Sequence, residues 1–477
     1  MSTLIDTLTA SGGTESAGFL NDIVAQLWPN ICVAGGQIIK DSVEPILATT
    51  LPGPLSGLRF TKLDFGTVPF KFSHVDVHKT TTEGIKLDMN VDWEGVCDIE
   101  LDGNHVPKIG VEKVQLRGRL SILFCPLTNI IPLIGAMQIA FINTPTLNID
   151  FTDAANIADC SLIAKTVRST ILGVISSMFV LPNRFLVKLD ANTDYFKAYQ
   201  PDHGIIRLTI GKATGINPPK KSGASKFLAK IVKDIPDCFV KVDVGAEQWR
   251  TSVKKNKYDP EWNETHDFLV TDYEQSISVD VQDDDLVGDD DIGIGHTTIK
   301  EVLLNGGTHE LALTHNGDPS EVKLTIHAEF YNFIPEASLL TAASGGGAKD
   351  SVCGIITILV ASALGLQGQR DELNPAIQVT WGDKKFLTAA KTYTPGVDIF
   401  NPSFDQAFKI PLTADMLTSP GSFRISLMNK KVETGGAEVP FQDVLSAPGM
   451  VKDGSFDMGS GASVRASISV HGVQLAK

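Results

Sequence analysis

The sequence lacks most of the features that would assign it to a familiar chemical class. Its six cysteines are scattered and form no CxxC pair, so neither a zinc site nor a secreted-type disulfide framework is indicated, and we expect reduced thiols. Positive charge is in deficit, and the net charge of −15 argues against a nucleic-acid partner held through its phosphates. There is also no GxSxG elbow, HExxH pair or Walker A loop, so we expect no enzyme.

A membrane span is missing as well. The only uncharged run long enough to cross a bilayer covers residues 123–142, but Pro126, Pro132 and Gly135 interrupt it and favour a strand, a turn and a second strand. The N-terminus has no basic region before a long apolar stretch, and Ser2 excludes myristoylation. We therefore expect no transmembrane anchor in this chain.

What is present is enough apolar sequence for several cores. A chain of 477 residues, 43% of them hydrophobic, predicts roughly three domains of about 150 residues each. Residues 16–50 place apolar side chains at helical spacing, which predicts an amphipathic helix kinked near Pro29. Residues 204–331 alternate short strands with turn signals, which is typical of an antiparallel sandwich.

Between the helix and the sandwich the pattern has a period of two. In residues 84–103, GIKLDMNVDWEGVCDIELDG, nearly all odd positions are apolar and most even positions are polar. Such a strand would run roughly 50 Å unless it bends near Gly95, so we expect an elongated domain. The alternation recurs in residues 114–124, 137–141 and 147–151. One face of a long sheet is therefore apolar, either as a core packed against helices or as a lipid-lined groove, and the pattern alone does not choose.

An acidic cluster lies within the predicted sandwich. Six aspartates fall within residues 283–291, and carboxylates so close repel one another unless water screens them or a cation binds. Ca²⁺ prefers carboxylate oxygens, and a loop that folds back can aim several of them at one ion. An EF-hand fails because Ile294 would stand where the bidentate Glu belongs. A loop between two strands, helped by a carboxylate from a neighbouring loop, fits better, and a solvated acidic loop is the alternative.

The middle segment resembles a C2 domain. The resemblance rests on IPDCFVKV at the first loop, DPEWNE at the following turn and VQDDDLVGDDDIG at the third loop. It implies Ca²⁺ as a cofactor, although Lys220 stands where the family's first Asp would be. The implied metal ligands are Asp237, Asp283, Asp285 and one of Asp290 and Asp291.

Residues from about 14 to 192 resemble the synaptotagmin-like mitochondrial-lipid-binding-protein (SMP) domain of extended synaptotagmins and tricalbins. The motifs, which occur in order, are AQLWPN, DSVEPIL, RFTKLDFG, VQLRGRLSILFCPL, IGAMQIAFINTPTLNID and VLPNRF. This family belongs to the tubular lipid-binding superfamily, in which helices and a rolled sheet enclose an apolar channel, often dimerised end to end. The resemblance implies a bound glycerophospholipid and favours the groove over the packed core. The expected lining residues are Leu87, Met89, Val91, Trp93, Ile99, Leu101, Val114, Leu116, Leu120, Ile122, Met137, Ile139 and Phe141.

The third segment resembles a second, more diverged C2 domain. GIITILVASALGLQG is similar to its first strand, NPSFDQAF to its second-loop turn, and FRISLMNKKVETGGAEV occupies the third-loop place. Asn429, Lys430 and Lys431 replace the acids there, so we expect no Ca²⁺ in this copy. The preceding AASGGGAKD stretch indicates a flexible joint.

Lysines and apolar residues beside these loops predict membrane contact. In KFLAKIVKD apolar side chains stand among lysines, a composition suited to the interface of an anionic membrane, although charge runs are commonly solvated. The expected contact residues are Lys220, Lys221, Phe227, Leu228, Lys430 and Lys431.

These patterns and resemblances predict an α+β and all-β multidomain chain. We expect an elongated tubular SMP-like α/β roll at residues 14–192, an antiparallel β-sandwich C2 domain at 204–332, a flexible linker at 333–351 and a second C2 sandwich at 352–476. The expected function is to bind glycerophospholipid and transfer it between membranes, with C2 domains docked on anionic membrane; the alternative is an adaptor that transfers no lipid. We expect a cytoplasmic, peripheral protein at endoplasmic-reticulum contact sites, a homodimer through the SMP-like domain, and no nucleic acid.

Overall fold

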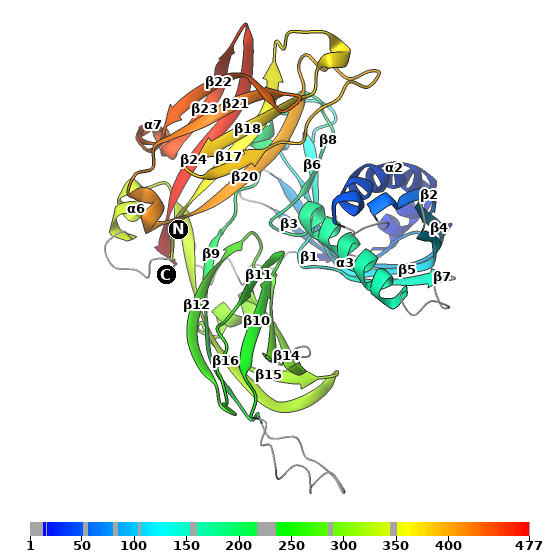
Figure 1. Ribbon diagram of the computed structural model, residues 1–477, viewed down its shortest axis with the longest axis vertical. Coiled ribbons are helices and arrows are strands. Elements are labelled where there is room, and N and C mark those ends of the chain that lie inside the picture. The colour runs from blue at the N-terminus through cyan, green and yellow to red at the C-terminus, as the bar shows by residue number, and fades with distance from the viewer. Residues whose placement is uncertain are drawn as a thin grey trace, which may run out of the picture.

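The computed structural model has three units, one of helices and sheet and two β-sandwiches that lie along the long axis of the molecule (Figure 1). The structure describes residues 13–15, 17–50, 56–79, 84–103, 106–152, 160–216, 235–284, 290–343 and 351–476.

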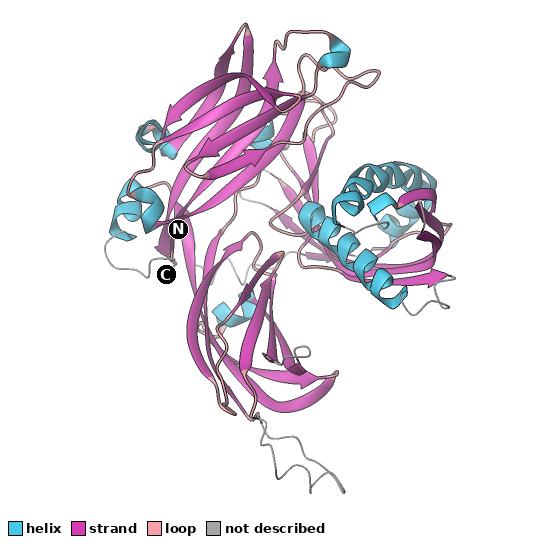
Figure 2. Ribbon diagram, in the orientation of Figure 1, coloured by secondary structure: helices cyan, strands magenta, loops and turns pink. Residues whose placement is uncertain are grey.

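Two long helices and an eight-stranded antiparallel sheet form the N-terminal unit (Figure 2). The helices are α2 (Gly18–Thr50) and α3 (Cys160–Phe179), and none of the described helices is long and apolar enough to cross a bilayer. The strands are β1 (Gly13–Glu15), β2 (Arg59–Asp64), β3 (Lys71–Lys79), β4 (Ile85–Gly103), β5 (Val106–Phe124), β6 (Ala136–Phe141), β7 (Thr146–Thr152) and β8 (Phe185–Lys188). Their order is β1-β3-β4-β5-β6-β8, while β2 pairs with β4 and β7 with β5.

The central strands β4 and β5 confirm the prediction of long alternating strands. Each has 19 residues, and they pair along nearly their whole length. The register slips between Val96 and Ile99, directly after the predicted bend at Gly95. Apolar odd residues of β4 share one hydrophobic cluster with residues of α2 and α3, so both helices cover the same face of the sheet.

The first sandwich follows a short helix, α4 (Tyr195–Ala198). Its elements are β9 (Gly204–Thr214), β10 (Cys238–Val244), β11 (Glu247–Arg250), β12 (Glu261–Val270), β13 (Ser276–Asp283), β14 (Asp290–Thr298), α5 (Ile299–Leu304), β15 (Thr308–His315) and β16 (Asp318–Ile334). Alternate residues of these strands point inward, and Val240, Phe268 and Ile277 are fully buried in its core. The predicted antiparallel sandwich is confirmed.

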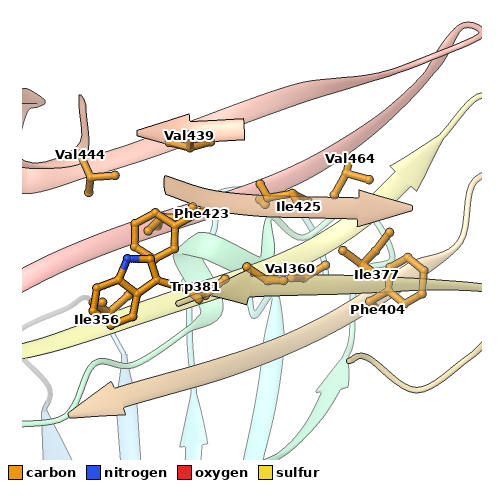
Figure 3. Packing of buried hydrophobic residues seen from close by; sticks show 14 of the residues in the cluster. Ile356, Val360, Ile377, Trp381, Phe404, Phe423, Ile425, Val439, Val444 and Val464 are labelled. Atoms are coloured by element: carbon orange, nitrogen blue, oxygen red, sulfur yellow. The ribbon is translucent and has the colours of Figure 1, made fainter. Parts of the chain in front are cut away.

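The second sandwich has a core of stacked aromatic rings (Figure 3). Trp381 stacks on Phe423 with ring centroids 5.7 Å apart, and Phe441 packs against both. Its main elements are β17 (Val352–Leu364), β18 (Pro375–Trp381), β19 (Lys384–Leu387), β20 (Ser403–Thr413), β21 (Ser422–Asn429), β22 (Val432–Pro440), α7 (Phe441–Ser446), β23 (Val451–Gly459) and β24 (Ala462–Leu475). This third predicted unit is also an antiparallel sandwich.

The segment between the sandwiches is more ordered than the sequence predicts. Strand β16 extends to Ile334, and helix α6 (Ala337–Ala343) follows within the expected linker 333–351. Leu340 is buried in the core of the second sandwich, which anchors this helix. A flexible joint is therefore wrong for residues 333–343, and the three glycines of the linker lie outside the described residues.

The last strand of the chain joins the two sandwiches. Strand β24 pairs with β17 inside its own sandwich and with β16 of the first sandwich, through residues 472–475 and 331–334. The strands of both sandwiches thus form one continuous 12-stranded sheet beside a separate four-stranded sheet, β19-β18-β21-β22. Backbone hydrogen bonds therefore fix how the two units meet.

Candidate ligand cavity and loop sites

An apolar cavity lies between the helices and the sheet of the N-terminal unit. Its volume is about 300 Å³, at the lower end of the usual range of about 300–1,000 Å³ for small-molecule pockets, and the empty space reaches about 1280 Å³ when the open space at its mouth is included. The walls come from α2, α3, β2, β4, β5 and β7, and every lining side chain is aliphatic, aromatic, glycine, methionine or cysteine. A ligand held here meets no charge and no amide group, so its buried part must be hydrocarbon.

Two tryptophans show how the cavity is kept apolar. Trp28 of α2 and Trp93 of β4 lie 5.8 Å apart, and the ring of Phe70 contacts both. Each indole N–H donates to a backbone carbonyl, Trp28 to Gly66 at 2.9 Å and Trp93 to Val68 at 2.8 Å. Because these polar atoms are satisfied by backbone, only the ring surfaces face the ligand space.

The thiol in the cavity wall carries no charge. Burial, and then the nearby Asp64 carboxylate, raise the pKa of Cys32. Burial likewise raises the pKa of the neighbouring Cys97 to about 11. Both thiols stay protonated near neutral pH and act as small apolar groups.

Two acidic loops meet at one end of the first sandwich. The backbone N–H of Asp237 donates to Asp283 Oδ1 at 2.7 Å, and Asp237 Oδ1 accepts from the backbone N–H of Asn256 at 2.8 Å. The next carboxylate, Asp284, forms an ion pair with Arg250 at 3.0 Å. Asp237 and Asp283, from two different loops, are thus in contact, and carboxylate oxygens are the hard donors that Ca²⁺ prefers.

The loop between β21 and β22 of the second sandwich takes the place of the acidic loop after β13 of the first sandwich, and it is basic. Lys430 and Lys431 are exposed and form the two-residue turn between β21 and β22, both with positive φ. This geometry is that of a tight hairpin turn, which Gly or Asn fills more easily than Lys. The next residue, Val432, is 65% exposed, so two cations and one apolar side chain project from this loop.

Comparison with known proteins identifies two domain families in this chain and a set of similar proteins. A family model for the synaptotagmin-like mitochondrial-lipid-binding domain matches residues 13–190, and a C2 domain model matches residues 204–311. Extended synaptotagmin-2 of Homo sapiens is 26% identical over 487 residues, covering 97% of this chain and 51% of its own length. Extended synaptotagmin-1 of Mus musculus is 27% identical and covers 94% of this chain and 41% of its own length. The chain is similar to the extended synaptotagmins.

The fold of the chain is also similar to that of a solved structure. The structure of the SMP domain and two C2 domains of extended synaptotagmin 2 covers 97% of this chain and all of its own, with a TM-score of 0.65 and 23% identity. The chain spans about half the length, or less, of the curated relatives it matches. The predicted order of an SMP domain followed by C2 sandwiches is confirmed.

The structure divides the predicted lipid-binding residues into two groups. Five of the thirteen line the cavity of the SMP domain, namely Trp93, Ile99, Leu101, Val114 and Leu116. The other eight are outside its lining and continue the same face of the sheet toward the far end of β4 and β5; they are Leu87, Met89, Val91, Leu120, Ile122, Met137, Ile139 and Phe141.

The lining residues predicted from the sequence did not include those that α3 and β7 contribute to the cavity wall. Those from α3 include Val167, Ile171, Val174 and Met178, whose spacing of three and four residues is a readable signal of one helix face. Residues 147 and 149 of β7 also line the cavity, and their alternation was visible in the sequence.

Only part of the predicted metal set is brought together in the first C2 domain. Asp237 and Asp283 are adjacent, but Asp291 lies on β14 with its carboxylate 4.0 Å from His315. Its charge raises the pKa of Asp280, after burial as the larger cause. Asp285 and the side chain of Asp290 lie outside the described residues. Among the residues that the structure describes, no group of three or more His, Cys, Asp or Glu is placed to hold a metal.

The predicted membrane contacts are also only partly placed. Lys430 and Lys431 occupy an exposed loop tip of the second C2 domain. Lys220, Lys221, Phe227 and Leu228 belong to residues 217–234, which lie outside the described part of the chain.

A buried charge network joins the SMP domain to the first C2 domain. Lys86 of β4 forms ion pairs with Asp88 at 2.8 Å and with Asp272 of the C2 domain. Burial alone would raise the pKa of Asp88, but the hydrogen bond from His78 and the Lys86 charge outweigh it and lower that pKa to about 2. Arg184 is buried beside these carboxylates, and its Nε and Nη1 have no hydrogen-bond partner within the described residues.

Further ion pairs tie the second C2 domain to the rest. Lys409 contacts Asp202 at 2.7 Å, where Asp202 also accepts from Thr271 of the first C2 domain. The pairs to the SMP domain and the segment after it are Lys188 with Asp405 and Arg465 with Asp194, each at 2.9 Å. The three domains therefore meet at one polar junction.

Proposed function

We propose that the SMP domain carries a glycerophospholipid with its acyl chains in the apolar cavity and transfers it between membranes. The observation that supports this is the uncharged and almost wholly apolar lining of the cavity, which has a volume of about 300 Å³ and opens into further space at its mouth. Moving an acyl chain through water costs about 0.8 kcal/mol per CH₂, so a protein sheath removes most of the barrier to exchange. No nucleophile or base is needed for carriage, and we propose a carrier that is not an enzyme.

A cavity-filling variant tests this proposal. Leu116→Trp places a large ring in the cavity, and Val33→Trp, at a position 77% exposed on α2 and outside the lining, is the matched control. Native mass spectrometry should show bound lipid in the unmutated chain and the control but not in Leu116→Trp, and fluorescent-lipid exchange should follow. A folded Leu116→Trp protein that keeps its lipid would refute the assignment, and an unmutated protein without lipid would favour the adaptor function.

We further propose that the C2 domains dock the chain on anionic membranes. Asp237 and Asp283 of the first C2 domain are suited to bind Ca²⁺ together with Asp285, and the ion would bridge them to lipid phosphate. Lys430 and Lys431 of the second C2 domain are suited to contact anionic headgroups without a metal. With lipid carriage, such docking places the chain peripherally at contacts between membranes, including those of the endoplasmic reticulum.

We also propose a homodimer through the SMP domain. Phe19, Ile23 and Leu27 recur every four residues along α2 and are 67%, 49% and 47% exposed, so they form one apolar stripe on the outside of the helix. Light scattering of the unmutated chain and of Ile23→Asp should show a dimer only for the former.

A further inference from the structure

An uncharged loop projects from the end of the SMP domain that lies beyond the cavity. It connects β5 to β6 within residues 123–142, a run with no charged residue that the lipid cavity does not account for. At its tip Ile130 is 71% exposed and Ile131 is 88% exposed. Leu127, Leu133 and the neighbouring Leu189 are exposed as well, which makes a contiguous aliphatic tip.

The loop holds this tip in one shape. Thr128 N–H donates to Leu133 O at 2.8 Å, and Gly135 N–H donates to Pro126 O at 2.8 Å. Leu133 adopts a positive φ of 73°, a conformation that a bulky residue rarely takes. A strained and ordered loop that exposes isoleucines to water is an arrangement that folding alone does not favour, so it indicates a binding role.

An apolar strip connects the loop to the cavity. Register partners in a sheet point to the same face, and four successive rows on the cavity side of β4, β5, β6 and β8 are almost entirely apolar. The first two rows, starting beside the cavity, are Val91 with Gly118 and Met89 with Leu120 and Phe141. The third row is Leu87, Ile122, Ile139 and Phe185, and the fourth is Ile85, Phe124, Met137 and Val187. Other side chains cover the strip next to the cavity, where Val91, Met89 and Phe141 are buried, whereas Ile85 at its far end is 36% exposed. The eight predicted lining residues outside the cavity are all members of this strip.

We propose that residues 127–133 insert into a lipid bilayer and that acyl chains pass along this strip to reach the cavity. The inference rests on the proposed lipid carriage. A bilayer is the occupant favoured here because the loop offers no charge to select a protein, and because a tip of a few aliphatic side chains is far smaller than the roughly 1,000 Å² that a stable protein interface needs. An apolar tip of this kind suits the headgroup–acyl boundary of a membrane.

The test uses the full chain and vesicles of pure phosphatidylcholine, whose neutral surface gives the C2 lysines no net charge to bind. Ile130→Ser with Ile131→Ser removes the tip without touching the core, and Val33→Ser is the matched exposed control. We expect flotation with the vesicles and fluorescent-lipid exchange to fall by about tenfold for the double variant and not for the control. The amount of lipid bound at purification should stay unchanged, because the cavity is intact.

The outcomes separate this inference from the proposed function. Equal flotation and exchange by the double variant would overturn the inference, and so would a change from dimer to monomer, which would show that a second copy covers the tip. If the unmutated chain holds and exchanges no lipid, the proposed carriage fails, while flotation still decides whether the loop inserts. A block within the strip, Leu120→Trp or Ile139→Trp, should slow exchange while lipid is retained; unchanged exchange in both folded variants would refute the route.

Discussion

The Lys86 network predicts that one substitution weakens the contact between the SMP domain and the first C2 domain. Lys86→Met keeps an unbranched side chain, one atom shorter, but removes the cation shared by Asp88 and Asp272. Both carboxylates are almost completely buried, with side chains 3% and 7% exposed. They would be left facing each other, with Arg184 and His78 as the basic side chains that remain beside them among the described residues.

The expected cost follows from burial and charge. Breaking a buried ion pair by removing one partner costs about 3–5 kcal/mol, and Arg184 places this case near the lower limit, about 3 kcal/mol at pH 7. The lowered pKa of Asp88, about 2 against the ordinary 3.8, is worth about 2 kcal/mol of stability. That contribution is present above pH 4 and is lost as the pH falls through about 2. Without Lys86 the pKa of Asp88 rises, so the variant should lose less relative to the unmutated chain at pH 4 than at pH 7.

Denaturant unfolding at pH 4 and pH 7 measures the loss of stability in Lys86→Met. Small-angle scattering then shows whether the SMP domain and the first C2 domain have separated. Asp272→Asn is the comparison, because it leaves the Lys86–Asp88 pair in place and should cost less. An unchanged first unfolding transition in Lys86→Met, or an equal loss at pH 4 and pH 7, would refute the argument.

Three other outcomes are expected. Asp237→Asn with Asp283→Asn should abolish Ca²⁺-dependent sedimentation with anionic liposomes, and equal binding of the unmutated chain in Ca²⁺ and in chelator would contradict the site. Burial raises the pKa of Glu247 from 4.5 to about 7. The contribution of this side chain to stability is therefore full below pH 4.5 and is lost as the pH rises through 7. Thermal unfolding of Glu247→Gln should show a gain in stability of about 3 kcal/mol over the unmutated chain at pH 8 and none at pH 4. Lys430→Glu with Lys431→Glu should weaken the salt-sensitive binding to anionic liposomes that is measured without Ca²⁺. Binding that changes neither with salt nor with this charge reversal would exclude a contact between the two lysines and the headgroups.

The sequence predicted the sheets well because a period of two is a local signal. The alternation in residues 84–103 specifies which side chains share a face, and β4 has that face over its full length. Where the cavity ends along the face depends on how α2 and α3 cross the sheet, which is a tertiary property. For this reason Trp93 and Leu116 line the cavity whereas Val91 and Leu120 do not.

On the polar face of the same strand, the alternation predicts the wrong exposure for one residue. Asp88 occupies an even position that reads as solvent-exposed, yet it is only 2% exposed in the structure. The C2 domain that supplies Asp272 to this network lies more than 180 residues further along the chain, so no local pattern could indicate it. The acidic cluster of residues 283–291 is an intermediate case. Its composition predicts a cation site, which stays a prediction, whereas the contact between Asp237 and Asp283 depends on the fold.

The pairing of β24 with β16 has a mechanical consequence. When one C2 sandwich is held at a membrane and the other is pulled, the load falls on the four residue pairs between 331–334 and 472–475 and on the side-chain contacts beside them, including Lys409 with Asp202. The four pairs are joined by main-chain hydrogen bonds, so surface substitutions away from the Lys409–Asp202 contact leave this part of the coupling nearly unchanged. The two C2 domains should therefore transmit force as one stiff arm, and a single-molecule pulling experiment should find that shortening the chain before Gly472 turns this arm into a hinge.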